Sequence, residues 1–211
     1  MDILYRIKRS VFTFIGDIKW SGITHPFWFT INACGYGLRG DHYREVIPLL
    51  QPGDIVIRRF EGYIDKWFIP GWWNHAGVYI GGENERVVHA ISNGVMCDDI
   101  LNFMRTDHMI VLRYNKEDPE YINEVVERAK SIVGKEYDFA FDFDKSDRFS
   151  CTELASYCHP KLSLKPKKSW QSFYKSVLVA DDFVNCEDLS IVWDSRSSSV
   201  INLYNKGAVN G

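Results

Sequence analysis

The chain has 211 residues, of which 45% are hydrophobic and 15% aromatic, enough to bury the core of one globular domain with appended ends. Its formal net charge of −3 gives no reason to expect a nucleic-acid partner, because phosphate binding needs clustered Lys and Arg. The one short basic cluster, 161–168, contains Pro166 and no interleaved aromatic residue, which is typical of a solvated loop.

The cysteines indicate reduced thiols. There are five of them, an odd number without the close spacing of a disulfide framework or a zinc site. We therefore expect no metal and no cofactor.

No run of residues approaches the ~20 apolar positions of a membrane span. Residues 1–20 mix basic, acidic and apolar side chains and are too interrupted for a secretory signal. This predicts a cytoplasmic location, with delivery to the cell envelope by another route left open. The amphipathic pattern of these residues favours a helix packed on the domain, and the alternative is a helix in peripheral contact with a membrane.

Periodicity, turn residues and helix caps predict a β-rich first part followed by helices. In chain order, the predicted elements are a short helix or turn at 40–50, a turn at 51–54, a strand at 55–59, an aromatic loop at 63–73, a hairpin of strands 74–81 and 86–91, a strand near 94–96, a short helix near 99–105, a strand at 109–113, a helix from Asp118 to Gly134, and a helix that begins at Cys151.

This pattern also suggests a division of the chain into three parts. We expect residues 1–39 to form the N-terminal amphipathic helix and a wrapping segment, residues 40–194 to form the folded domain, and residues 195–211 to form a flexible tail rich in Ser, Asn and Gly.

Two histidines lie on the predicted hairpin. In strand 74–81, the period of two places His75, Gly77 and Tyr79 on one face. His89, on the second strand, shares that face only if the connecting loop has an odd number of residues, and the sequence does not fix this parity. A histidine on a strand is more often structural than catalytic, but two on one hairpin are consistent with a base and its orienting partner.

Cys151 opens a helix with an apolar period. A thiol at a helix N-terminus is close to the positive end of the macrodipole and to backbone amides that can hold an oxyanion. With a nearby imidazole to take its proton, we expect a thiolate at neutral pH. The alternative is a small buried side chain, the usual role of a cysteine in a helix. Two histidines also suit a metal, although no further ligand has a convincing spacing.

Several short motifs occur in an order that resembles a known family. They are 52–56 (PGDIV), 74–81 (NHAGVYIG), 87–90 (VVHA), 94–95 (GV), 111–113 (VLR), 134–138 (GKEYD) and 150–154 (SCTEL). Over about residues 40 to 190, the chain resembles the permuted, NlpC-type papain-like cysteine hydrolases of the YiiX-like branch.

The resemblance implies a circularly permuted papain-like α+β fold, with an antiparallel sheet or barrel packed against helices and the histidine strand before the cysteine helix. It implies Cys151 as the nucleophile and His75 as the base. The orienting group of this branch is often a carboxylate at the position of His89. A histidine there resembles the NlpC-type triad and the lecithin:retinol acyltransferase-like enzymes, and Glu153 is the second candidate.

The predicted activity is acyl transfer through a thioester, with the Cys151 amide holding the oxyanion. Tyr137, Trp73 and Tyr79 are the predicted substrate-binding residues, and other aromatic residues of the loop that includes Trp72 are further candidates. The resemblance favours an amide bond as substrate, such as one in a peptidoglycan peptide. The alternatives are a lipid ester or thioester hydrolase or acyltransferase, and a non-catalytic binding module.

Overall fold

A computed structural model describes residues 18–20, 29–31, 36–61, 71–83, 85–138, 147–165, 167–168 and 176–197. The chain divides into two units, Met1–Gly37 and Leu38–Gly211. In the first unit, β1 (Ile18–Trp20) and β2 (Phe29–Ile31) pair antiparallel within the segment expected to wrap. The predicted N-terminal helix, most of the aromatic loop and residues 198–211 of the predicted tail lie outside the described residues.

The second unit is built on a six-stranded antiparallel sheet. In spatial order its strands are β10 (Leu189–Asp194), β7 (His108–Tyr114), β3 (Ile55–Arg59), β4 (His75–Gly81), β5 (Arg86–Ile91) and β6 (Gly94–Asp99). The other elements are α2 (Gly40–Val46), the short 3-10 helix η1 (Ile47–Leu49), α3 (Ile100–Phe103), α4 (Pro119–Ser131), α5 (Cys151–Cys158), α6 (Ala180–Val184), and the paired β8 (Lys167–Lys168) and β9 (Ser176–Val177).

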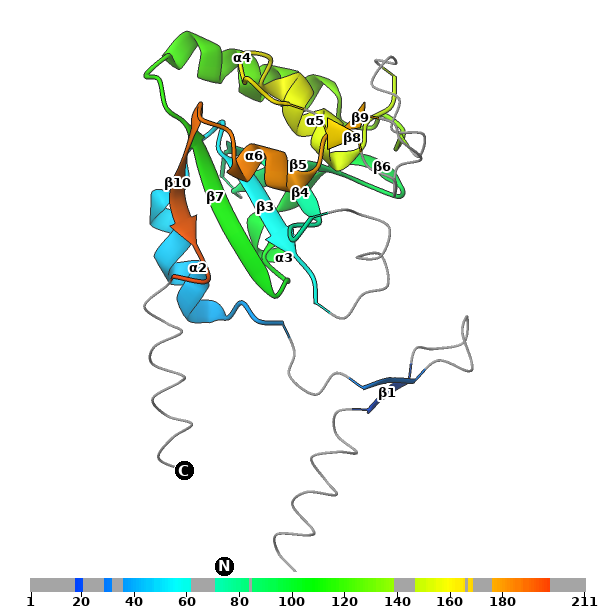
Figure 1. Cartoon of the computed structure of the whole chain (residues 1–211). Coiled ribbons are helices and arrows are strands. Elements are labelled where there is room, and N and C mark those ends of the chain that lie inside the picture. The colour runs from blue at the N-terminus through cyan, green and yellow to red at the C-terminus, as the bar shows by residue number, and fades with distance from the viewer. Residues whose placement is uncertain are drawn as a thin grey trace, which may run out of the picture. The chain divides into compact units, whose positions relative to one another are not determined.

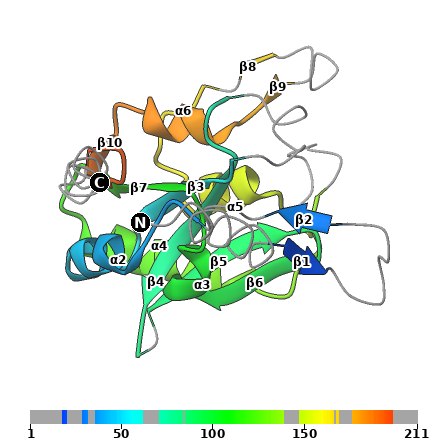
Figure 2. The same cartoon turned by 90° about the horizontal axis from the view of Figure 1, so that it is seen from below.

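Helices cover both faces of the sheet, so most residues of the inner strands β7, β3, β4 and β5 are buried. Figure 1 shows α4 and α5 along one face and α2 towards the other, and Figure 2 shows α3 next to β5 and β6. The first core joins Ala76 and Val78 of β4 to residues of α4, α5 and α6. The second core contains Tyr79 of β4 together with residues of α2 and α3. The predicted alternation along β4 and the α+β class are confirmed.

The two edge strands of the sheet, β10 and β6, make different contacts with the rest of the chain. Strand β10 follows α6 and pairs with β7, with a register shift between Ile191 and Trp193 that marks a β-bulge. Ser195, the first residue of the predicted tail, continues this pairing because its Oγ accepts the Met109 amide and its own amide bonds the Met109 carbonyl. At the opposite edge, the amide of Val95 in β6 donates to the Lys135 carbonyl after α4.

The turn before β3 is tied to two distant parts of the chain. The buried Asp54 carboxylate accepts two hydrogen bonds of 2.8 Å from the Arg113 guanidinium of β7. Nε2 of His159, just after α5, donates to the Gly53 carbonyl at 2.9 Å. Burial raises the pKa of Asp54, and the Arg113 hydrogen bonds oppose that rise. These contacts connect the PGD motif to the VLR motif and to the end of the cysteine helix.

Gly77 sets the spacing between β4 and β5. It lies directly opposite His89, and a Cβ on Gly77 would be 2.8 Å from Cγ1 of Val87 and 3.1 Å from Cβ of His89. Only a residue without a side chain fits this position at the present spacing of the strands. His89 therefore lies on the same face of the sheet as His75, the first of the two arrangements that the sequence allowed.

The Asp54–Arg113 pair is expected to contribute strongly to stability. Replacing Arg113 by Met leaves the Asp54 carboxylate buried without its partner, so the free energy of unfolding should fall on the order of 3 kcal/mol. Urea unfolding of the purified variant measures the change. The double variant Asp54→Asn/Arg113→Met should recover part of the loss, because the uncompensated charge is gone.

The matched control, Lys161→Met, removes an exposed ion pair with Asp118 and should change stability little. Equal losses in the Arg113 and Lys161 variants would contradict this account.

Substituting Gly77 by Ala tests the close approach of β4 and β5. The added methyl group has to displace Val87 or His89, so we expect a loss of about 1–3 kcal/mol in unfolding free energy. Thermal and urea unfolding measure it. Gly40→Ala is the control, because the nearest atom to its added Cβ is the end of the Arg44 side chain at 3.8 Å. A Gly77→Ala protein as stable as Gly40→Ala would show that the spacing is not constrained.

Candidate active site

Cys151 is the first residue of α5, and a reciprocal cap fixes this end of the helix. Oγ of Ser150 accepts the Glu153 amide at 3.4 Å, and Oε2 of Glu153 accepts the Ser150 amide at 2.6 Å. This S-x-x-E capping box is readable in the sequence as Ser150-Cys151-Thr152-Glu153. Glu153, the second candidate for the orienting role, thus serves as a helix cap.

The thiol of Cys151 lies among backbone amides. Hydrogen bonding from the backbone amides of Ala76, Thr152 and Cys151 itself acts to lower the pKa of this thiol. Ala76 follows His75 in β4, so the nucleophile candidate and the base candidate are brought to the same end of that strand. Within the described part of the chain, no hydrogen bond directly joins the sulfur to either imidazole, a common situation in enzymes without substrate.

The two predicted histidines form a pair. Nε2 of His75 and Nδ1 of His89 are 2.9 Å apart, and the two rings are perpendicular, with centroids 5.1 Å apart. Because Nε2 of His75 is used in this contact, Nδ1 is the nitrogen that remains to take a proton from a thiol. The predicted association of His75 with His89 is therefore present in the structure.

Phe103 and Arg58 enclose the imidazole pair. The Phe103 ring lies 5.8 Å from that of His75 and 5.3 Å from that of His89. The Arg58 guanidinium lies over the Phe103 ring at 4.2 Å and donates to the Phe103 carbonyl at 2.9 Å. Arg58 is also the residue directly opposite His75 across β3 and β4. A buried cation therefore stands beside the imidazoles.

Burial and the Arg58 charge set the protonation of the site. Burial, and then Arg58, holds the pKa of His75 well below its ordinary value and lowers that of His89 to about 4. Burial raises the pKa of the Cys151 thiol, while the surrounding amides and Arg58 act in the opposite direction. This differs from the thiolate expected at neutral pH. The closed environment favours a neutral thiol beside a neutral imidazole in the free protein.

The predicted substrate-binding aromatic residues divide into two groups. Tyr137 is half-buried near Cys151 and Glu153, and burial is the main reason that its pKa is raised. Trp73 and Tyr79 are only 2% and 6% exposed. Both belong to the cores on either side of the sheet. Both rings pack within these cores, and a role of Trp73 and Tyr79 in substrate binding stays a prediction.

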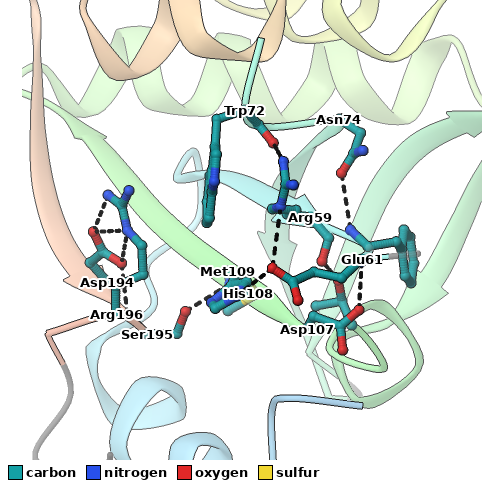
Figure 3. Close-up of polar contacts among 12 residues, drawn as sticks. Arg59, Glu61, Trp72, Asn74, Asp107, His108, Met109, Asp194, Ser195 and Arg196 are labelled. Carbon is teal, nitrogen blue, oxygen red and sulfur yellow. Dashed lines mark hydrogen bonds and ion pairs between the residues drawn. The ribbon is translucent and has the colours of Figure 1, made fainter. Parts of the chain in front are cut away.

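Polar contacts hold the segment that leads into His75 (Figure 3). The Asn74 side chain accepts the Phe60 amide at 3.0 Å, and the Trp72 carbonyl accepts from the Arg59 guanidinium. Asp181 of α6 accepts the amides of both Trp72 and Trp73 at 3.2 and 3.0 Å. The Arg59 guanidinium also covers the Trp72 ring at 4.5 Å. Asn74 of the NHAG motif thus fixes the start of β4.

Sequence reasoning missed two charged residues near the imidazole pair, Arg58 and Asp98. The sequence places Arg58 only within the predicted strand 55–59, and its position opposite His75 follows from the pairing of β3 with β4. Asp98 was missed because the predicted strand near 94–96 stopped too early. The two-residue turn at 92–93 places Asp98 opposite Val87 once the strand is extended to Asp99.

No helix among the described residues is long and apolar enough to cross a membrane. In the same part of the chain, no group of three or more His, Cys, Asp and Glu residues is arranged to hold a metal ion.

Comparisons with known proteins agree with this architecture. Residues 49–200 match the model of a family described as permuted papain-like amidase enzymes, YaeF/YiiX, C92 family. The crystal structure described as metalloprotein YiiX from Escherichia coli O157:H7 is similar, with a TM-score of 0.59 and 16% sequence identity, over 69% of this chain and 97% of that chain. None of the curated proteins matches. The match covers most of the chain, which therefore belongs to the permuted papain-like amidases of the YaeF/YiiX, C92 family, hydrolases of the cysteine peptidase and amidase type.

Proposed function

We propose that this protein cleaves an amide bond by acyl transfer to Cys151, with His75 as base and His89 as the group that orients His75. The observation that carries the proposal is the 2.9 Å contact between Nε2 of His75 and Nδ1 of His89. It leaves Nδ1 of His75 available at the start of β4, next to Ala76, whose amide acts to lower the pKa of the Cys151 thiol.

The reaction begins with a neutral pair. As the sulfur attacks the substrate carbonyl carbon, the thiol proton moves to Nδ1 of His75, and the carbonyl oxygen becomes an oxyanion. Amides at the start of α5, including that of Cys151, are the donors for this oxygen. The C–N bond then breaks, and the amine leaves with the proton from His75. Water attacks the thioester with His75 as base, which releases a carboxylic acid and restores the thiol.

The substrate that we favour is an amide in a peptide of the peptidoglycan type. The amidase family supports an amide or peptide substrate, and the wall peptide is the more specific part of the proposal. Cytoplasmic synthesis with delivery to the envelope by another route belongs to the same proposal. Cell fractionation tests it.

The reactivity of Cys151 with iodoacetamide tests the catalytic pair. A thiol and an imidazole that share one proton react at a rate that stays level between their two pKa values, so the wild-type rate should be nearly constant from pH 6 to 8. In His75→Ala, the rate should rise about tenfold per pH unit, because only free thiolate reacts. Peptide mapping and intact mass identify the modified cysteine.

Half-exposed Cys97 is the internal control for this experiment, because its alkylation should be the same in both proteins. A Cys151 rate that is equal in wild type and His75→Ala at every pH would remove the proposed base.

Substrate assays distinguish the proposed activity from its alternatives. We expect purified muropeptides to yield new free amines with wild type, detected by mass spectrometry, and at least a 10²-fold lower rate with Cys151→Ala because the nucleophile is lost. Release of fatty acid from lipid micelles, with intact muropeptides, would instead favour the lipid hydrolase or acyltransferase. A Cys151→Ala protein that retains its full function would indicate a binding module.

A further inference from the structure

Three polar side chains form a diagonal row across one face of the sheet. His89 of β5 lies opposite Gly77 of β4, two residues beyond His75. On the other side, His89 lies opposite Met96 of β6, two residues before Asp98. Diagonal neighbours on adjacent strands are within reach of aromatic and long side chains. The row therefore runs from His75 through His89 to Asp98.

The Asp98 carboxylate is held in place by its own surroundings. Its Oδ1 accepts the Asp99 amide at 2.8 Å and the Asn102 side-chain amide at 3.0 Å. Asp99 is the N-cap residue of α3, and Asn102 lies within that helix. Oδ2 is directed to His89 and lies 3.8 Å from its Nε2. This distance is longer than a hydrogen bond and within the reach of an ion pair.

Nε2 of His89 is a buried nitrogen that needs this partner. His89 is 2% exposed, and in the described part of the chain Nε2 makes no hydrogen bond. The groups around the ring are His75 of β4, Arg58 of β3, Phe103 of α3 and Asp98 of β6. Among these, only Asp98 offers an acceptor to an N–H at Nε2.

We propose that Asp98 is a positioning residue that keeps the His89 proton on Nε2 and so gives His75 the tautomer required of a base. This inference rests on the proposed function of His75 and Cys151. Asp98 would then be the fourth functional group of the site, after Cys151, His75 and His89.

The direction of the hydrogen bond between His75 and His89 decides whether His75 can act as a base. With the His89 proton on Nε2, Nδ1 of His89 has a lone pair and accepts a hydrogen bond from Nε2–H of His75. Nδ1 of His75 then has a lone pair for the thiol proton. With the proton on Nδ1 of His89, this nitrogen becomes the donor and Nε2 of His75 becomes the acceptor. Nδ1 of His75 then carries a proton and cannot act as a base.

The carboxylate also acts during the reaction. When His75 takes the thiol proton, the positive charge is shared with His89 through their hydrogen bond. The fixed negative charge of Asp98 then lies at the far end of the row, opposite in sign to the Arg58 charge near its other end. Closing the 3.8 Å gap to a charge-assisted hydrogen bond would stabilise that state.

The test compares Asp98→Asn with Asp98→Ala in the full chain. Asn at this position keeps an oxygen for the Asp99 and Asn102 donors, so its amide NH₂ faces His89 and favours the reversed tautomer. Nitrogen-15 NMR of the histidine rings reports the tautomers directly, with His75→Gln and His89→Gln used for assignment. The level part of the Cys151 alkylation profile reports the consequence for the thiol.

We expect the proton on Nε2 of both His75 and His89 in wild type, and on Nδ1 of both in Asp98→Asn. The level alkylation rate should fall at least tenfold in Asp98→Asn and by less in Asp98→Ala, which imposes no donor. Asp99→Asn is the control, because Asp99 caps α3 by accepting the Leu101 amide and Asn caps equally well. Its tautomers and its alkylation rate should match wild type.

The same tautomers in Asp98→Asn as in wild type would overturn the role of Asp98. Equal alkylation profiles in the two proteins would do so too, provided that the reactivity of Cys151 falls in His75→Ala. A wild-type proton on Nδ1 of His89 would do so as well. If the tautomers are as expected but Cys151 does not depend on His75, the proposed function fails, while the control of His89 by Asp98 stands.

Discussion

Strands β4 and β5 approach each other at Gly77 more closely than a side chain allows, because a Cβ there would be 2.8 Å from Val87. This approach brings the His89 ring beside His75 without a third side chain between them. The backbone of the same strand also influences Cys151, because hydrogen bonding from the Ala76 amide acts to lower the pKa of that thiol. The backbone of β4 thus influences the Cys151 thiol, and the side-chain alternation of the same strand places His75 next to His89.

The site is arranged for a neutral resting state. Burial raises the pKa of the thiol and lowers those of both imidazoles, so an ion pair would have to form against desolvation. Amides at the start of α5 and the Asp98 carboxylate beyond His89 are fixed before the reaction begins. Such fixed dipoles stabilise developing charge without reorganisation. The Phe103 ring packs beside both imidazoles, and the burial of His89 increases the contribution of nearby charges.

Much of this fold was predictable from local signals, and the failures have identifiable causes. The hairpin of β4 and β5, the cap of α4 at Asp118 and the start of α5 at Cys151 follow from turn residues, a proline and periodicity. The register of the hairpin does not follow from these signals. The pairing shifts between Tyr79 and Gly81, and this bulge changes which residues of β5 share a face with His75.

The surroundings of several residues depend on packing between distant segments, which local sequence signals do not reveal. Trp73 was expected at a substrate surface because it ends an aromatic loop, but Asp181, more than 100 residues away (108), accepts its amide, and the ring is buried in the core. The capping role of Glu153 was present in the sequence as a simple motif. The position of Asp98 becomes visible only when β6 is taken at its full length, and the strand signal in the sequence ends at Met96.

Strand β10 has a consequence for the order in which the chain can be assembled. It is the last described strand, yet it pairs with β7, whose residues from Met109 to Leu112 are buried. Until β10 arrives, β7 is an edge with unpaired amides and an apolar surface, the kind of edge that pairs with other chains. A chain stopped before residue 189 would contain the thiol, both histidines and Asp98, and would still be prone to aggregate. The bulge in β10 then gives the completed sheet an irregular border that resists further strand addition.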